Sequence, residues 1–186
     1  MQVYKVLKNQ EFKLGRYRLI PIRSEDRYKI MEWRNDQIFH LRQTEILTEE
    51  TQDSYFKNVI EKLFNQILPE QILFSFLEDE VCIAYGGLVH IDWKNRNAEI
   101  SFLIETNREK SQFALLWSIY LKLIEKIAFK ELQLHKIFTY AIDLRPKLYP
   151  ILIEADFKIE AVLKEHIFLN EKFVDVVIHH KINTNE

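Results

Sequence analysis

Apolar residues recur at two different spacings along this chain of 186 residues, and the spacings assign most of it to strands or helices. Short apolar or alternating runs predict strands, whereas apolar residues spaced three and four apart predict helices. We expect strands over residues 17–22, 72–77, 81–91, 98–105, 136–143, 157–169 and 173–182. We expect helices over residues 24–35, 48–65, 110–132 and 146–155. This order contains no internal repeat and predicts one α/β domain over residues 1–186, with a sheet partly antiparallel and partly parallel.

The two central strands hold an unusual share of the glycines. The chain has three glycines, and two of them, Gly86 and Gly87, lie inside the predicted strand 81–91. A glycine in the middle of a strand marks a bulge or a close approach to the backbone. The next strand leads directly to helix 110–132, whose broad apolar face must pack against a sheet. We therefore expect a ligand site where this strand pair meets that helix.

Charge and hydropathy exclude several classes of partner. The chain carries 26 basic and 28 acidic residues, a net charge of -2, and the two signs are interspersed. Such a chain has no basic field to attract nucleic acid or an anionic membrane surface. No apolar run is long enough for a membrane-spanning helix. We expect a soluble protein that binds neither nucleic acid nor membrane.

Cysteine and histidine usage narrows the chemistry further. Cys82 is the single cysteine, so an internal disulfide is excluded and a reducing cytoplasmic compartment is expected. The six histidines lack the spacings of metal-binding motifs, and no metal is expected. Neither a nucleophile elbow nor a phosphate-binding Walker loop is present.

Seven short segments, in order along the chain, resemble the GNAT acetyltransferase superfamily. They are residues 19–23, 31–35, 86–88, 97–102, 128–137, 155–160 and 173–176. The likeness covers nearly the whole chain and is strongest to the branch of ribosomal-protein alanine and nucleotide-aminosugar N-acetyltransferases. It implies an α/β GNAT fold, in which helices flank a mixed central sheet that ends in an antiparallel hairpin.

The resemblance also implies a cofactor and a reaction. Acetyl-CoA, the acyl donor, would bind where two parallel strands separate, with its pantetheine along the backbone of Phe102, Leu103 and Ile104. Its pyrophosphate would lie on the N-terminus of the following helix, where unpaired amides attract anions. A substrate amine would attack the thioester directly, while a base takes the amine proton and an acid protonates the thiolate.

The family's phosphate-binding signature is degenerate here. It starts with glutamine or arginine and places glycines at the start of the core helix. Counting forward from the preceding strand puts Ser111 and Phe113 at the glycine positions, whereas counting back from the following strand puts Leu115 and Trp117 there. A side chain at such a position obstructs the approach of phosphate to backbone amides. The candidate contacts are Arg108, Lys110, Ser111, Gln112 and Phe113.

Glu99 is the candidate base. It is a carboxylate in an otherwise apolar strand, and burial raises the pKa of a carboxyl toward neutrality. It would act directly or through a water molecule. The alternative is an ion pair at the strand edge with Lys94 or Arg96.

Tyr149 is the candidate acid for the leaving thiolate. The family often has an asparagine and a tyrosine in this helix, at positions occupied here by Arg145 and Leu152. Tyr149 lies about one turn before Leu152 and can face the same way. The alternative is that Tyr149 is a core residue.

The end of the first helix and the segment after it would form the acceptor wall. Arg34 suits bidentate binding of a phosphate or carboxylate, as a nucleotide-linked amino sugar requires. Core packing of Trp33 and helix capping by Asn35 are compatible alternatives. The candidate acceptor contacts are Trp33, Arg34, Asn35, Arg42, Gln43 and His90.

Three functions follow from these residues. The first is an acetyl-CoA-dependent N-acetyltransferase of a small amine, in particular a nucleotide-linked amino sugar. The second is acetylation of protein N-termini. The third is a GNAT-fold module that binds without catalysing, because the phosphate-loop glycines and the usual tyrosine are missing. The sequence is also compatible with a homodimer.

Overall fold

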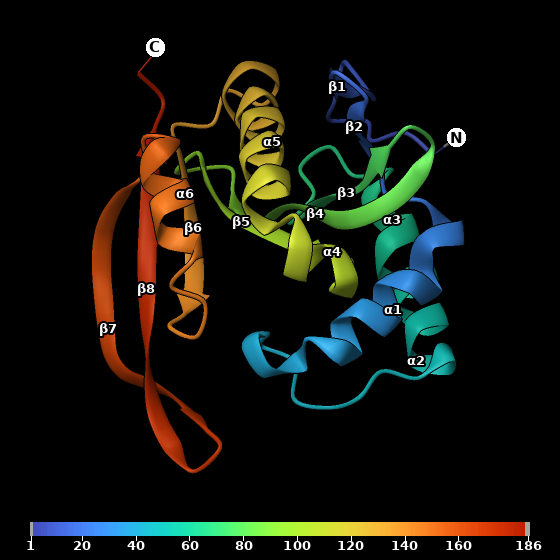
Figure 1. The fold of residues 1–186 in the computed structure, drawn as a ribbon. Helices are drawn as coiled ribbons and strands as arrows, with labels where there is room; N and C mark the ends of the chain where they lie inside the picture. The colour runs from blue at the N-terminus through green and yellow to red at the C-terminus, as the bar shows by residue number, and fades with distance from the viewer. Residues whose placement is uncertain (1, 185–186) are drawn as a thin grey trace.

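A computed structural model describes residues 2–184, and its strands form one eight-stranded sheet of order β1-β2-β3-β4-β5-β6-β8-β7 (Figure 1). Only the β5–β6 pair is parallel among the neighbouring strands of this described sheet. The strands are β1 (Phe12–Leu14), β2 (Tyr17–Pro21), β3 (Ile72–Glu78), β4 (Val81–Asp92), β5 (Asn97–Ile104), β6 (Lys136–Ile142), β7 (Lys158–Leu169) and β8 (Lys172–Ile182). The seven predicted strands are confirmed to within one residue at each end, and the short β1 is additional.

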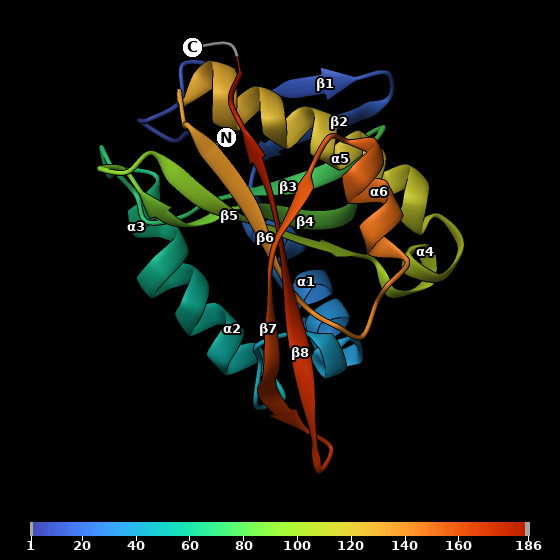
Figure 2. The ribbon, with the colours of Figure 1, turned by 90° about the vertical axis from the view of Figure 1, so that its left-hand side faces the viewer.

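Helices cover both faces of the sheet. Helix α5 lies against one face, and α1 and α2 lie below the other (Figures 1 and 2). The helices are α1 (Arg27–Asp36), α2 (Glu49–Tyr55), α3 (Glu61–Leu63), α4 (Thr106–Ser111), α5 (Phe113–Glu125) and α6 (Leu148–Glu154). A π-helical segment, Phe56–Ile60, joins α2 to α3, and another, Lys126–Glu131, extends α5. None of the helices in residues 2–184 is long and apolar enough to cross a membrane.

The prediction of one helix over residues 110–132 was wrong. The chain turns helical at Thr106, is interrupted at Gln112, whose φ is -127°, and resumes at Phe113. The interruption separates two segments that differ in burial. Helix α4 has no buried residue, whereas the inward-facing apolar positions of α5 begin at Phe113.

The two strand glycines permit close packing within the chain. A Cβ on Gly86 would lie 2.2 Å from the carbonyl oxygen of Ser101 and 2.8 Å from the hydroxyl of Tyr120. A Cβ on Gly87 would lie 1.9 Å from the carbonyl oxygen of Ile72. The predicted close approach is confirmed, and the groups that approach are neighbouring strands and α5.

The parallel pair β5–β6 is short. Its register runs from Asn97 opposite Lys136 to Glu99 opposite Phe138. Beyond this point β5 continues to Ile104 while pairing with β4 alone, and β6 pairs with β8. The two strands therefore separate immediately after Glu99.

The terminal hairpin β7–β8 extends well past the rest of the sheet (Figure 2). Its turn residues Asn170 and Glu171 have φ of 48° and 61°, the left-handed conformation of a tight hairpin turn. Strand β8 lies between β6 and β7, so the hairpin continues the sheet from the far side of β6.

Candidate active site

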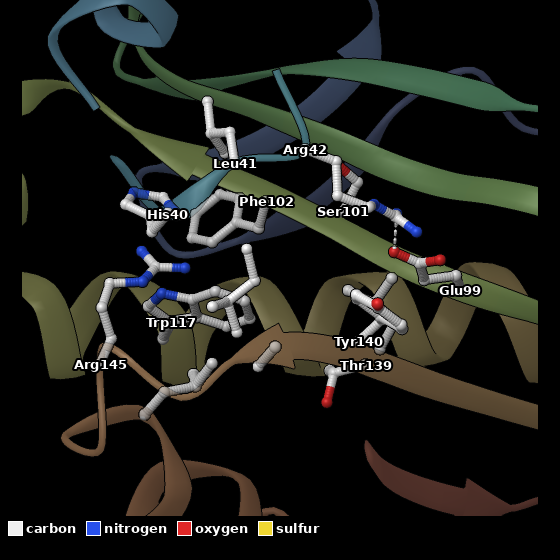
Figure 3. A pocket seen from close by; sticks show the side chains of 14 residues that line it. His40, Leu41, Arg42, Glu99, Ser101, Phe102, Trp117, Thr139, Tyr140 and Arg145 are labelled. Atoms are coloured by element: carbon white, nitrogen blue, oxygen red, sulfur yellow. Dashed lines mark hydrogen bonds and ion pairs between the residues drawn. The ribbon is translucent and has the colours of Figure 1, made fainter. Parts of the chain in front are cut away.

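A first cavity of about 100 Å³ opens where β5 and β6 separate (Figure 3). Strand β5 contributes Glu99, Ser101 and Phe102 to its lining, and β6 contributes Thr139 and Tyr140. The remaining lining residues named in the figure are His40, Leu41, Arg42, Trp117 and Arg145. The cavity thus brings together residues far apart in the sequence, with Glu99 and Arg42 at one end and Arg145 and His40 at the other.

Glu99 is a buried carboxylate with two cationic or polar partners. Its side chain is 7% exposed, and Arg42 donates from Nη2 to Oε1 (Figure 3). His90 Nδ1 lies 2.9 Å from Oε2. The alternative expected from the sequence, an ion pair of Glu99 with Lys94 or Arg96, was wrong. A bulge brings His90 to the carboxylate, and a distant loop brings Arg42 to it.

His90 reaches Glu99 from an irregular position in β4. The register of β4 against β5 shifts between Val89 and Asp92, and His90 has φ of 49°. Bulges re-aim side chains, and such a backbone conformation is uncommon for a residue other than glycine. A carboxylate only accepts hydrogen bonds, so an Nδ1–H donor leaves His90 Nε2 with its lone pair. The imidazole is 64% exposed.

The loop after α1 positions Arg42. Asn35 accepts a hydrogen bond from the Leu47 amide at 2.8 Å and donates to the Leu47 carbonyl at 2.9 Å. Gln43 donates to Asn35 Oδ1 at 3.1 Å. Asn35 therefore holds the loop, in place of the expected cap on its own helix. The guanidinium of Arg42 also lies 4.7 Å from the ring centroid of Tyr140.

The other end of the first cavity contains polar atoms without protein partners. Among the described residues, His40 Nδ1 and Trp117 Nε1 are buried there and unbonded. Burial, followed by the nearby charge of Arg145, lowers the pKa of His40 to about 3. Burial also lowers the pKa of Arg145 to about 10. Buried polar atoms are normally paired, so this end of the cavity suits a polar ligand.

Bulky side chains occupy the start of α5, where the family resemblance predicts a phosphate-binding loop. Phe113 is buried, and Lys147 Nζ lies 4.1 Å from its ring centroid. Trp117 is buried edge-to-face against Phe102, with centroids 5.0 Å apart. In neither register does a glycine stand at the start of α5. Leu103 and Ile104 are buried and do not line the cavity, unlike Phe102.

The polar candidates on α4 are mostly engaged elsewhere. Arg108 donates to Glu78 at 2.6 Å and to Glu105 at 3.1 Å. Its Nη1 also donates to Gln112 Oε1 at 3.1 Å. Ser111 donates to a backbone carbonyl of its own helix at 3.1 Å, and Lys110 is exposed. Arg108 and Gln112 therefore brace α4 against β3 and the end of β5.

Tyr149 lies beside the first cavity and does not line it. Its hydroxyl donates to Asp143 Oδ1 at 2.6 Å, and its ring stacks on His179 at 5.1 Å. Burial and the neighbouring Asp143 carboxylate raise the pKa of Tyr149. Leu148, its neighbour on α6, does line the cavity, and Leu152 is fully buried. The role of Tyr149 as an acid stays a prediction.

A second cavity of about 290 Å³ lies between α1, α2 and strands β3 and β4. Ser101 lines both cavities, so both border β5. Arg34 faces the second cavity, donates from Nη1 to the Tyr85 hydroxyl at 2.6 Å and donates from Nε to Gln43 Oε1 at 2.9 Å. Trp33 is buried in the core and lines neither cavity, which agrees with the core-packing alternative.

Metal ligands and reactive thiols do not gather at either cavity. Within the described part of the chain, no group of three or more histidine, cysteine or acidic side chains is placed to hold a metal ion. Cys82 is buried, and burial raises the pKa of its thiol to about 12.

Comparison with known proteins gives a family and a set of similar folds. The family model described as Acetyltransferase (GNAT) domain matches residues 19–178. Spermidine N-acetyltransferase from Vibrio cholerae in complex with CoA and spermine is 20% identical, with a TM-score of 0.77 over 92% of this chain and 98% of that one. The dodecameric structure of that enzyme in an intermediate state is 20% identical, with a TM-score of 0.72 over 92% and 96%. No curated protein matches the sequence. At this identity the solved structures establish a shared fold.

Proposed function

Since this chain belongs to the GNAT acetyltransferase family and is accordingly an N-acetyltransferase, we propose that it transfers acetyl from acetyl-CoA to the primary amine of a small substrate. The observation that carries the proposal is the separation of β5 from β6 beside the buried carboxylate of Glu99. The free strand edge can hydrogen-bond amides of the donor, and a buried acid–base group beside it can take the proton of the attacking amine.

The first cavity fits the pantetheine arm of the donor better than the diphosphate. Amides of the arm need donors and acceptors, which Trp117 Nε1 and His40 Nδ1 supply. For the diphosphate, Arg145 and Lys147 replace the missing glycine loop, since their charged groups lie 5.8 and 4.1 Å from the ring centroid of Phe113 at the start of α5. Bound acetyl-CoA supplies an activated acyl thioester to this site.

Glu99 and His90 form the proposed proton acceptor. The carboxylate holds the Nδ1–H of His90 at 2.9 Å, which leaves Nε2 free to accept a proton. An imidazolium formed in this way is stabilised by the carboxylate behind it, as in other histidine–carboxylate pairs. Arg42 keeps the carboxylate in place from the opposite side.

Tyr149 remains the proposed acid for the leaving thiolate. Its hydroxyl would exchange its hydrogen bond to Asp143 for one to the sulfur of the leaving group. The raised pKa of Tyr149 keeps the phenol protonated at neutral pH, as an acid must be.

The second cavity is the proposed acceptor site. Its volume of about 290 Å³ is that of a small-molecule site, and Ser101 connects it to the first cavity. A nucleotide-linked amino sugar remains the finer proposal for the acceptor, supported by the cation of Arg34. The occupied start of α5 at Phe113 and Trp117 favours one rival function, a non-catalytic module.

We also propose a cytoplasmic homodimer. The exposed apolar side chains of Ile159, Phe168 and Phe173 on the protruding hairpin offer a surface for a second copy. The Vibrio cholerae relative of this fold forms a dodecamer, which supports self-association.

A thermal-shift titration with acetyl-CoA and CoA tests the proposal. A ligand that binds the folded state raises Tm, and saturation at about 100 times Kd stabilises by about 2.7 kcal/mol. The absence of a shift at millimolar acetyl-CoA would overturn the enzyme function. Thiol release with a panel of amines would then identify the acceptor class, and a shift without release from any amine would favour the binding module.

A further inference from the structure

Arg34 is a partly buried cation whose partners are neutral. Its hydrogen bonds go to the Tyr85 hydroxyl and the Gln43 side-chain oxygen, and no carboxylate within the described residues forms an ion pair with it. Removing a charge from water is costly unless an opposite charge or enough hydrogen bonds compensate. The free protein therefore holds an uncompensated positive charge against the second cavity.

The rest of the second cavity offers no negative charge. Its other polar lining groups are the tyrosines, glutamines, threonine and serine at Thr51, Gln52, Tyr55, Gln71, Tyr85 and Ser101. Gln52 is committed to a backbone carbonyl of α1 at 2.8 Å. The remaining lining is apolar and includes Ile30, Phe56 and Leu73. A ligand that matches this surface has an apolar part and one anionic group.

Resting on the function proposed above, we propose that the acceptor amine carries a carboxylate or phosphate that Arg34 binds, and that polyamines are poor acceptors. The planar guanidinium pairs well with either anion. A polyamine would instead bring several positive charges to a cavity that already holds one, without a carboxylate to receive them. The acceptor preference would then differ from that of the Vibrio cholerae spermidine N-acetyltransferase with the similar fold.

The two cavities give the acceptor a direction. Arg34 and Tyr85 would hold the anionic group in the second cavity, and Ser101 marks the junction with the first. An amine a few bonds from the anionic group would then point toward β5, where Glu99 lies two residues before Ser101. Compact molecules such as α-amino acids and phosphoethanolamine have this spacing between amine and anion.

Binding and turnover of matched probes test the proposal on the full chain. L-leucine and L-leucinamide differ in the carboxylate, phosphoethanolamine and glucosamine 6-phosphate supply the phosphate, and spermidine supplies the polycation. Each probe is titrated by thermal shift with and without CoA, and thiol release from acetyl-CoA is measured in parallel. The variants are Arg34→Met, which keeps the length of the stem, and Arg27→Met as a control on the same helix. Arg27 pairs with Asp53 and lines neither cavity.

We expect an anionic probe to raise Tm and to be acetylated, with leucinamide and spermidine weaker by tenfold or more. Arg34→Met should raise KM for the anionic probe by about tenfold to a hundredfold with little change in kcat, since it removes binding shared by ground and transition states. Arg27→Met should leave KM unchanged. A preference for leucine over the phosphates identifies a carboxylate acceptor, and the reverse identifies a phosphate.

Three results would overturn the proposal: spermidine accepted better than every anionic probe, no anionic probe shifting Tm, or an anionic probe bound equally by Arg34→Met. These are distinct from failure of the enzyme function. If acetyl-CoA causes no shift while an anionic probe binds in an Arg34-dependent manner, the cavity is an anion-binding site on a non-catalytic module.

Discussion

The buried imidazole of His40 should make the free energy of unfolding of this protein decrease on mild acidification. The imidazole is 7% exposed at the end of the 3-10 turn Ile38–His40, and its Nε2 lies 3.3 Å from Gln37 Oε1. Burial and the charge of Arg145 lower its pKa from 6.5 to about 3. In the unfolded chain His40 therefore binds a proton below pH 6.5, whereas in the folded chain it stays neutral.

The sign and size follow from proton linkage. Between pH 6.5 and about 3 the unfolded state binds the extra proton, so the free energy of unfolding decreases as the pH falls. Lowering the pH from 7.5 to 5.5 crosses the unfolded pKa by one unit and should cost about 1.4 kcal/mol from this residue alone. For a chain of this length that corresponds to a decrease in Tm of about 3–6 °C.

Urea unfolding at pH 7.5 and 5.5 measures the effect, with His40→Gln as the matched variant. Glutamine keeps a donor for Gln37 and does not titrate in this range. Other titrating groups, including His179, whose pKa burial also lowers, act equally in both proteins. The wild type should lose about 1.4 kcal/mol more than the variant over this pH interval.

Equal losses in the wild type and the His40→Gln variant would refute the reasoning. They would mean that His40 accepts a proton in the folded state as readily as in the unfolded chain. A smaller difference at pH 5.5 in the presence of an anion would locate that anion near Arg145, because it would offset the positive charge that disfavours imidazolium.

Four further substitutions test the packing and the chemistry. Gly87→Ala should lower the free energy of unfolding by about 3 kcal/mol, because its Cβ meets a backbone oxygen at 1.9 Å. Gly15→Ala, with φ of 60° and open space around it, should lose only about 1 kcal/mol in the same urea experiment. Glu99→Gln should reduce kcat about 10²–10⁴-fold while leaving the thermal shift by acetyl-CoA unchanged, and a normal kcat would remove the Glu99–His90 pair as the proton acceptor. Tyr149→Phe should reduce kcat about 10²-fold or more with unchanged KM for the amine, and an unaltered kcat would assign its bond to Asp143 a structural role.

The sequence located part of the candidate site through local chemical contrast. Glu99 is conspicuous as a carboxylate in an apolar strand, and the structure does place it at a cavity. The partners of Glu99 could not be predicted from the sequence. Arg42 lies 57 positions away, and His90 reaches the carboxylate through a bulge that no residue pattern announces.

The orphaned atoms of the first cavity carried no sequence signal either. Trp117 looks like an ordinary core residue of a helix, and it becomes notable because its indole N–H lacks a partner in three dimensions. The uncompensated charge of Arg34 is of the same kind, since it depends on which side chains other segments bring near it.

The residue pattern alone therefore specified the strands, most of the helices and the resemblance to the acetyltransferase family. Such features depend on which face of each element is buried. The spacing of apolar residues within each short segment of the chain determines that face. The break at Gln112, the separation of β5 from β6 after Glu99 and the two cavities depended on the folded chain. Their physical reason is that packing, charge compensation and hydrogen bonding act between residues distant in sequence, and those distances exist only once the sheet and its helices are assembled.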